Sequence, residues 1–142
     1  MIKFAENNTE LIECFNVLSP LRPHLSLDSF ISSVERMSES TSYQVVYLKD
    51  DEIRAVAGFR ISEWLHTGKY LEIEELITKE GERSKGYGGE LFDWVLEYAK
   101  DQECSQLRLV SGISRDQAHK FYLNKGMSFE AKYFSIGVVA NR

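Results

Sequence analysis

The chain has 142 residues and a formal net charge of -5, with 43% hydrophobic and 27% charged residues. This length suits one domain that buries its own core, and the composition excludes a disordered tail protein or a fibre. The acidic balance argues against a nucleic-acid-binding protein. No apolar run approaches the ~20 residues of a membrane helix, and the first residues lack a signal-peptide core. We therefore expect one cytoplasmic domain over residues 1–142, without nucleic-acid or membrane partners.

The first half predicts a strand, two helices and a β-hairpin, in that order. Residues 2–4 form a short strand, and apolar residues recur at helical spacing over 11–18. Helical spacing returns over 26–37, where the first residue, a serine, is a candidate N-cap. Residues 43–48 and 53–61 are rich in β-branched and aromatic side chains and flank a polar turn, which predicts the hairpin.

The second half alternates strands with helices. Residues 70–78 predict a strand, 81–89 a glycine-rich turn, and 91–98 part of a helix with one apolar face. A short strand follows over 106–111. This order favours a mixed α/β sheet.

The last elements are a helix and a strand. The helix is predicted over 114–124 and opens with the capping box Ser114-x-x-Gln117. Residues 129–139 have the composition of a strand.

Elsewhere in the chain, Cys14 and Cys104 lack a partnering motif and the three histidines lack ligand spacing, so we expect no metal site and two reduced thiols.

The glycine-rich turn is the most informative stretch for function. Glycines allow the backbone to approach a ligand, and free amides at a helix start favour an anion. Arg83, Lys85 and nearby Lys79 add local positive charge. This combination suits a pyrophosphate, although a turn that simply joins a strand to a helix would also be rich in glycine.

Three phosphate-binding patterns can be compared with this turn. A nucleoside-triphosphate P-loop needs Gly-Lys followed by serine or threonine, whereas here Lys85-Gly86 is followed by tyrosine. A dinucleotide fingerprint needs a third glycine where Leu91 stands. The third pattern, Arg/Gln-x-x-Gly-x-Gly/Ala, holds the pyrophosphate of coenzyme A and is matched by Arg83-x-x-Gly86-x-Gly88.

Two segments resemble the GNAT superfamily of N-acetyltransferases. One is the strand, turn and helix from Tyr70 to Lys100. The other, Ala118–Met127, reads Ala-His-Lys-Phe-Tyr-Leu-Asn-Lys-Gly-Met and is similar to the family's Ala-x-x-Phe-Tyr-x-x-x-Gly-Phe. The first half of the chain matches in element order alone. Arg115 stands where many members carry asparagine, and it either contacts the cofactor through its charge or faces solvent.

The resemblance implies an α/β fold whose mixed, mostly antiparallel central sheet is flanked by helices and splayed into a V between its fourth and fifth strands. It implies a single N-acetyltransferase domain with acetyl-coenzyme A as cosubstrate in the opening of the V. The pyrophosphate would lie on the turn and the pantetheine arm along the fourth strand. The cofactor-binding residues implied in this way are Leu76, Ile77, Thr78, Arg83, Ser84, Lys85, Gly86, Tyr87, Gly88, Gly89 and Arg115.

Acetyl transfer to an amine requires a base, because an alkyl ammonium has a pKa near ~10.4. The candidates are carboxylates of the fourth strand. Strand alternation places Glu72 and Glu74 on one face, and Glu75 on the other with Leu71 and Ile73. We expect Glu72 or Glu74 to act as the base, through water. Glu75 is an alternative, as is a charged strand edge that only aids solubility.

Tyr122 is the expected general acid. The resemblance implies that this tyrosine sits beside the thioester sulfur and protonates or hydrogen-bonds the leaving thiolate, which suits a phenol with a pKa of about 10. The alternative is a core aromatic on the face of Ala118 and Phe121. His119, on the same helix, is a further candidate for the base.

The acceptor is expected to be the primary amine of a small molecule or a protein. In this superfamily the loop between the first two helices often borders the acceptor, so Arg22 and His24 are candidate contacts, together with Trp64. A backbone amide near Leu76 or Ile77, where the strand usually bulges in this fold, would meet the oxyanion.

We expect the amine to attack directly in a ternary complex, since neither cysteine lies in the matched segments. Dimerisation through the C-terminal strands is common among members, so a homodimer is a candidate assembly. The rival functions are a non-catalytic acyl-coenzyme A-binding sensor or regulatory module, and a protein-interaction domain without a ligand.

Overall fold

The computed structural model describes residues 1–139, which belong to two compact units: Met1–Leu109 and a second unit from Val110 onward. The second unit contains the helix α4 (Asp116–Asn124). The elements of the first unit are β1 (Ile2–Phe4), α1 (Asn8–Leu18), α2 (Leu27–Thr41), β2 (Gln44–Asp50), β3 (Glu52–Trp64), β4 (Gly68–Thr78), α3 (Tyr87–Asp101) and β5 (Gln106–Leu109).

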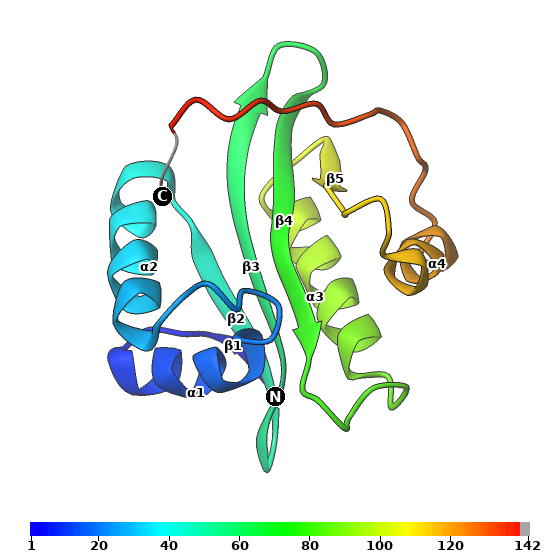
Figure 1. Ribbon diagram of the computed structural model, residues 1–142. Coiled ribbons are helices and arrows are strands. Elements are labelled where there is room, and N and C mark those ends of the chain that lie inside the picture. The colour runs from blue at the N-terminus through cyan, green and yellow to red at the C-terminus, as the bar shows by residue number, and fades with distance from the viewer. Residues whose placement is uncertain (140–142) are drawn as a thin grey trace. The chain divides into compact units, whose positions relative to one another are not determined.

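The first unit is built on one mixed sheet in the order β1-β2-β3-β4-β5 (Figure 1). Neighbouring strands are antiparallel except β4 and β5, which are parallel. β5 pairs with β4 from Tyr70 to Ile73, whereas β4 continues to Thr78. From Glu74 onward, no described strand pairs with the β5 side of β4. The predicted mixed, mostly antiparallel sheet and its splay between the fourth and fifth strands are confirmed.

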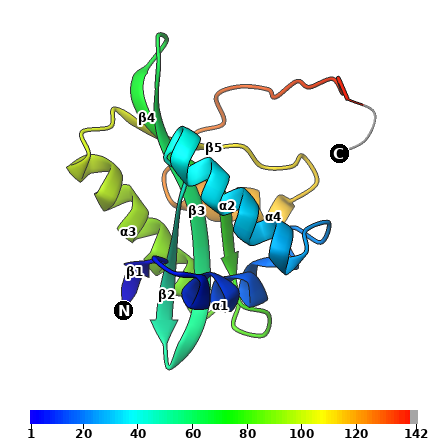
Figure 2. The same ribbon diagram turned by 90° about the vertical axis from the view of Figure 1, so that its left-hand side faces the viewer.

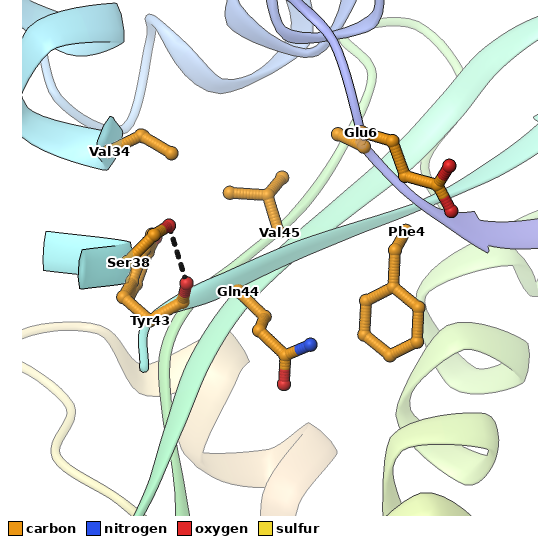
Figure 3. A pocket seen from close by; sticks show the side chains of 8 residues that line it. Phe4, Glu6, Val34, Ser38, Tyr43, Gln44 and Val45 are labelled. Atoms are coloured by element: carbon orange, nitrogen blue, oxygen red, sulfur yellow. Dashed lines mark hydrogen bonds between the residues drawn. The ribbon is translucent and has the colours of Figure 1, made fainter. Parts of the chain in front are cut away.

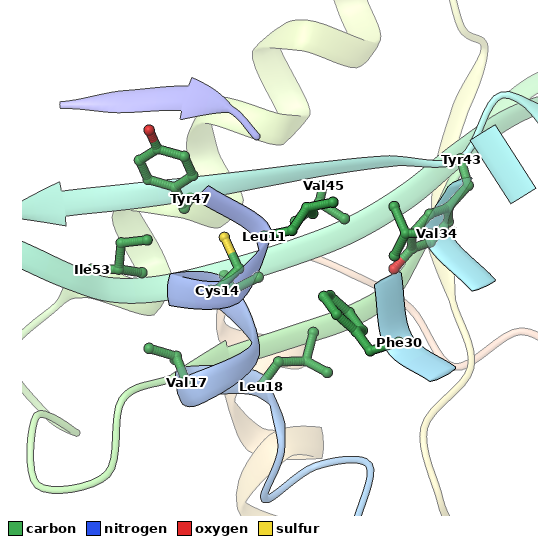
Figure 4. Packing of buried hydrophobic residues seen from close by; sticks show 11 residues of the cluster. Leu11, Cys14, Val17, Leu18, Phe30, Val34, Tyr43, Val45, Tyr47 and Ile53 are labelled. Carbon is green, nitrogen blue, oxygen red and sulfur yellow. The ribbon is translucent and has the colours of Figure 1, made fainter. Parts of the chain in front are cut away.

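Helices cover both faces of this sheet. α1 and α2 lie on one face and α3 on the other (Figures 1 and 2). The core under α1 and α2 joins Cys14 and Leu18 to Phe30 of α2 and to Val45 of β2 (Figure 4). Burying one such large apolar side chain contributes about 1.5–3 kcal/mol. Among the described residues, no helix has the length and apolarity that crossing a bilayer requires.

The α3 face has a core of its own. Leu91 and Val95 of α3 are fully buried. The Phe59 ring of β3 lies 5.6 Å from the Tyr98 ring, and Phe4 of β1 packs edge-on against the same tyrosine. The apolar face predicted for this helix therefore packs against β1 and β3.

The caps of α1 and α2 explain where these helices begin. Asn7 Oδ1 accepts a hydrogen bond from the Glu10 amide at 2.9 Å. The predicted cap at Ser26 is confirmed, because its side chain accepts from the Ser29 amide while the Ser29 hydroxyl accepts from the Ser26 amide. Such reciprocal caps satisfy amides that have no partner inside the helix.

Predictions for three features in the last third of the chain are wrong: the end of one strand, a capping box and a final strand. The predicted strand over 106–111 ends at Leu109. The capping box does not form, because Ser114 lies in the preceding turn and α4 begins at Asp116 with no side-chain cap. The predicted strand over 129–139 is absent: Phe134 and Ile136 are 86% and 87% exposed. Alternating apolar residues form a strand only where another strand pairs with the backbone.

Candidate active site

β4 carries a bulge at Glu74. Gly58 of β3 pairs with Glu75, but the next residue, Phe59, pairs with Ile73, so the backbone of Glu74 has no opposite residue in the β3–β4 register. An extra residue of this kind bends a strand and shifts the alternation of its side chains by one position. The resemblance predicts a bulge near Leu76 or Ile77. The observed bulge at Glu74 lies two residues before Leu76.

The bulge overturns the predicted distribution of the carboxylates. Glu75 lies opposite Gly58, and Glu72 lies opposite Arg60, two residues further along the same face of β3. Arg60 also binds Glu74. Glu72, Glu74 and Glu75, called here the carboxylate strip, therefore share the α1–α2 side of the sheet. The prediction that Glu75 faces the other side was wrong, because it assumed unbroken alternation.

Each carboxylate of the strip is paired with an arginine from a different element. The pairs are Glu72–Arg108 (Oε1 to Nε, 2.7 Å), Glu74–Arg60 (Oε2 to Nε, 2.5 Å) and Glu75–Arg22 (Oε2 to Nη2, 3.0 Å). Arg108 lies on β5, Arg60 on β3 and Arg22 in the loop between α1 and α2. All three side-chain pairs are partly buried. The three carboxylates predicted as candidate bases are thus brought together with three compensating positive charges.

Glu75 is the most buried carboxylate of the strip. The Tyr43 hydroxyl donates to its Oε1, and Arg22 donates to its Oε2 through Nε and Nη2. Burial raises the pKa of Glu75 above its usual value, although the Tyr43 hydrogen bond and the Arg22 charge act in the opposite direction. Burial and the Glu75 charge also hold the pKa of Tyr43 well above its usual range, so this hydroxyl keeps its proton.

The space around Glu75 depends on a glycine in the middle of β3. A Cβ at Gly58 would overlap the Tyr43 hydroxyl and lie 2.6 Å from Glu75 Oε1. A glycine inside a strand often marks a close approach of this kind. Gly58 therefore leaves room for the hydrogen bond between Tyr43 and Glu75.

Aromatic rings surround the arginine at the other end of the strip. The guanidinium carbon of Arg108 lies 3.7 Å from the ring centroid of Tyr70 and 4.2 Å from that of Trp64. The two rings meet edge-on, with centroids 6.3 Å apart. Trp64, a predicted acceptor contact, thus lies beside the strip, as does Arg22, whereas His24 is solvent-exposed.

The glycine-rich turn leaves the start of α3 uncapped. Gly81, Ser84 and Gly86 have φ of +86°, +69° and +88°, in the left-handed region that turns the chain sharply. Gly86 is the N-cap and makes no side-chain cap, so the amides of the first turn stay open to a ligand. A Cβ at Gly88 would lie 2.9 Å from Thr78 Oγ1, so the helix starts close against the end of β4.

Most of the positive charge predicted at this turn is already paired. Lys85 lies 2.8 Å from Glu82, and Lys79 pairs with Glu52. Arg83 is exposed and makes no ion pair with any residue in the described part of the chain. The local charge available to an anion is therefore smaller than the sequence suggested, and Arg83 supplies it.

The remaining predicted residues lie on or just before α4, in the second unit. Tyr122 is partly buried, and burial raises its pKa, while the charge of Arg115 acts to lower it. Arg115 occupies the N-cap position of α4 and is exposed. His119 Nε2 lies 2.8 Å from the Gly112 carbonyl oxygen, an interaction within the same unit.

One hollow, of about 280 Å³, lies beside β1, β2 and α2 (Figure 3). Its lining includes Phe4, Glu6, Val34 and Gln44, but none of the residues predicted to bind a ligand. Within residues 1–139, no group of three or more histidine, cysteine, aspartate or glutamate side chains is arranged to hold a metal ion.

Four residues of the site were not predicted from the sequence: Tyr43, Gly58, Arg60 and Arg108. The glycine carried a usable signal, since an isolated glycine within a strand pattern indicates a bulge or a close backbone approach. The arginines carried none, because an arginine in a half-buried strand ordinarily points to solvent. Their role becomes visible once the strand register is known.

Comparisons with known proteins agree with this fold. The model of the acetyltransferase (GNAT) family matches residues 6–129. The uncharacterized N-acetyltransferase YhdJ of Bacillus subtilis is 31% identical over 135 residues, which cover 94% of this chain and 95% of that protein. The aminoalkylphosphonate N-acetyltransferase of Salmonella typhimurium is 29% identical over 80 residues, covering 56% and 52% of the two chains.

Solved structures show the same architecture. One of them, a putative acetyltransferase from Agrobacterium tumefaciens, has a TM-score of 0.83 at 21% identity, and the match covers 97% of this chain and 99% of that one. At this identity the likeness concerns the fold. The match to the family model and the identity to YhdJ extend over most of the chain, and the chain therefore belongs to the GNAT family of acetyltransferases.

Proposed function

We propose that this GNAT acetyltransferase moves the acetyl group of acetyl-coenzyme A to a primary amine by direct attack in a ternary complex. The observation that carries the proposal is the carboxylate strip, which lies where β4 loses its pairing with β5. A partly buried set of carboxylates supplies groups that can take a proton from the amine as it attacks.

The cosubstrate has a suitable cradle in the first unit. The open amides at the start of α3 and the exposed Arg83 favour the pyrophosphate, which we assign to residues 83–89. The unpaired edge of β4 over Leu76–Thr78 supports pairing with the amides of the pantetheine arm. We keep Arg115 as a further candidate contact.

Proton removal is assigned to the carboxylate strip. The amine nitrogen forms a bond to the thioester carbonyl carbon, the carbon–sulfur bond breaks, and the amine loses a proton to a carboxylate directly or through water. A raised pKa makes Glu75 a better base than an ordinary carboxylate. Glu72 and Glu74 remain candidates, because both lie on the same side of the sheet.

Proton donation to the leaving thiolate is assigned to Tyr122. Burial raises the pKa of this phenol, so it is protonated at neutral pH. A covalent acetyl-cysteine intermediate is not favoured, because burial raises the pKa of Cys14 to about 12 and also raises that of Cys104. A thiol must ionise before it can act as a nucleophile.

The test is release of free thiol from acetyl-coenzyme A in the presence of an amine panel, with the acetylated amine identified by mass spectrometry. Thiol release that depends on the amine supports the transferase. A rise in melting temperature with coenzyme A but no turnover on any amine would instead favour the sensor module. No response of the melting temperature to coenzyme A would contradict both.

A further inference from the structure

We propose that the acceptor is a small primary amine that also carries an oxyacid group, a carboxylate or a phosphonate, and that Arg108 binds this group. The inference rests on the proposed function and specifies its substrate class. It starts from the charge balance of the site, the free donors of Arg108 and the position of Arg108 in the sheet.

The charge balance of the strip does not suit a polyamine. Each carboxylate is paired with a guanidinium at 3.0 Å or less. Glu72 also lies directly opposite Arg60 on β3, so it has an arginine on both neighbouring strands. A plain cation gains little net Coulomb attraction from such a neutral set of charges. A molecule with one positive and one negative group can interact with both members of the pairs.

Of the three arginines that pair with the carboxylate strip, Arg108 has hydrogen-bond donors that no described residue uses. Its Nε donates to Glu72, but its Nη1 and Nη2 donate to no residue that the structure describes. By contrast, both terminal nitrogens of Arg22 donate to partners in the first unit, and so do those of Arg60. A guanidinium with both terminal nitrogens available can bind an oxyacid through two parallel hydrogen bonds.

The rings beside Arg108 hold this donor pair in a fixed orientation. The guanidinium packs on Tyr70 and Trp64, and the Arg108 side chain is only 28% exposed. A guanidinium that is oriented and partly dehydrated before binding loses less conformational freedom when it binds an anion. Trp64 is itself 44% exposed, so the cluster borders solvent in the first unit.

The position of Arg108 relates the acid group to the reacting amine. Arg108 pairs with Glu72 across the β4–β5 ladder, one residue before the last pair, Ile73 with Leu109. An oxyacid on the free edge of Arg108 would therefore lie beside the carboxylate strip, where the amine is to be deprotonated. The guanidinium sets the acceptor's orientation and the strip takes the proton.

The experiment compares acceptors of equal chain length: an alkylamine, a diamine, an ω-amino carboxylic acid and an aminoalkylphosphonic acid. We expect kcat/KM of the two acidic acceptors to exceed that of the alkylamine by about tenfold or more. Arg108→Gln should raise KM for the acidic acceptors on the order of tenfold and reduce their advantage, with a smaller effect on kcat. Arg108→Lys should restore part of it. Arg36→Gln, a matched loss of charge on the exposed side of α2, should keep the wild-type preference.

Two results would overturn the inference. One is a preference for the alkylamine or the diamine. The other is an equal loss on all four acceptors in Arg108→Gln with the melting temperature lowered, which would make Arg108 merely structural. Calorimetric titration of the same acceptors into the coenzyme A complex tests the inference even without turnover. If the acid group adds no affinity in the titration, the proposed substrate class is refuted. If the acidic acceptors bind more tightly but no thiol is released, only the proposed transferase function is refuted.

Discussion

Arg22 donates two hydrogen bonds to one carboxylate oxygen of Glu75, Oε2, from Nε at 3.3 Å and from Nη2 at 3.0 Å. The same Nη2 donates to the Glu74 carbonyl oxygen at 2.9 Å. One side chain of the α1–α2 loop thus fixes both a buried carboxylate and the backbone of the bulge. The sequence predicts acceptor contacts in the α1–α2 loop and catalytic carboxylates on β4. The contact between Arg22 and Glu75 joins these two elements.

Replacing Arg22 by glutamine should move the pH dependence of the reaction. The Arg22 charge lowers the pKa of Glu75, so its loss raises that pKa further. A base acts in its deprotonated form, and its activity disappears as the pH falls through the pKa. In Arg22→Gln the acidic limb of kcat/KM should therefore shift to higher pH, as measured by thiol release, while Arg36→Gln leaves it in place. An unmoved limb would exclude Glu75 as the base and leave Glu72 and Glu74.

Gly58→Ala should weaken the fold and the site together. The new methyl group would overlap the Tyr43 hydroxyl and force it away from Glu75. Overpacking of this kind costs about 1–3 kcal/mol of the free energy of unfolding, which urea denaturation can measure. Gly137→Ala is the matched control, since nothing lies within 4 Å of a Cβ there. Equal stability of the two variants would mean that Tyr43 can move without cost.

The order and type of most elements could be predicted because they depend on local patterns. Helical spacing and the serine cap at Ser26 identify α2, and β-branched residues around a polar turn identify the β2–β3 hairpin. The bulge at Glu74 could not be predicted in place, since it depends on how two strands pair. A one-residue shift in pairing moves a side chain to the other face, which is why the prediction for Glu75 was wrong.

Local sequence patterns also fail to predict the partners of Arg60 and Arg108 and the structure of residues 129–139. Arg60 and Arg108 bind glutamates far away in sequence, and no local pattern identifies the partner of a half-buried arginine. Residues 129–139 have the alternation of a strand, yet within the described residues no strand pairs with them. Propensity describes a residue's own preference, whereas a strand also needs a neighbour to take its hydrogen bonds.

Gly88→Ala should impair cosubstrate binding without unfolding the protein. An alanine inside a helix is more favourable than glycine by up to about 1 kcal/mol, but its methyl group would lie 2.9 Å from Thr78 Oγ1 and push the start of α3 away from β4. We expect weaker binding of coenzyme A by calorimetry at an unchanged or higher melting temperature. Adding Thr78→Ala should recover part of the affinity. If Gly88→Ala binds coenzyme A like the wild type, the close approach does not matter for the cradle.

Tyr122→Phe should lower kcat with little change in coenzyme A affinity. Loss of a general acid reduces rates by about 10²–10⁴-fold, and the substitution keeps the ring and its contact with Phe121. Tyr133→Phe, at an exposed position in the same unit, is the control. A kcat within about twofold of the wild type would assign Tyr122 to packing and leave water as the proton donor.

Glu10 should make the fold sensitive to acid. The Tyr47 hydroxyl donates to its Oε2 at 2.5 Å, and this bond is the main reason that its pKa falls to about 2, with the Glu6 amide and Lys3 helping. A carboxyl whose folded pKa is depressed stabilises the protein above its ordinary pKa of 4.5, and this contribution is lost as the pH falls towards 2.

Tyr47→Phe should therefore destabilise the protein at pH 7 by about 1.5–3 kcal/mol, measured by urea denaturation, because a charge-assisted hydrogen bond disappears. At pH 2, close to the lowered pKa of Glu10 in the folded protein, the difference between the two proteins should be clearly smaller. Tyr133→Phe should show no difference at either pH. A Tyr47→Phe deficit that stays constant from pH 7 to pH 2 would mean that the hydroxyl contributes through packing, with no role for the ionised carboxylate.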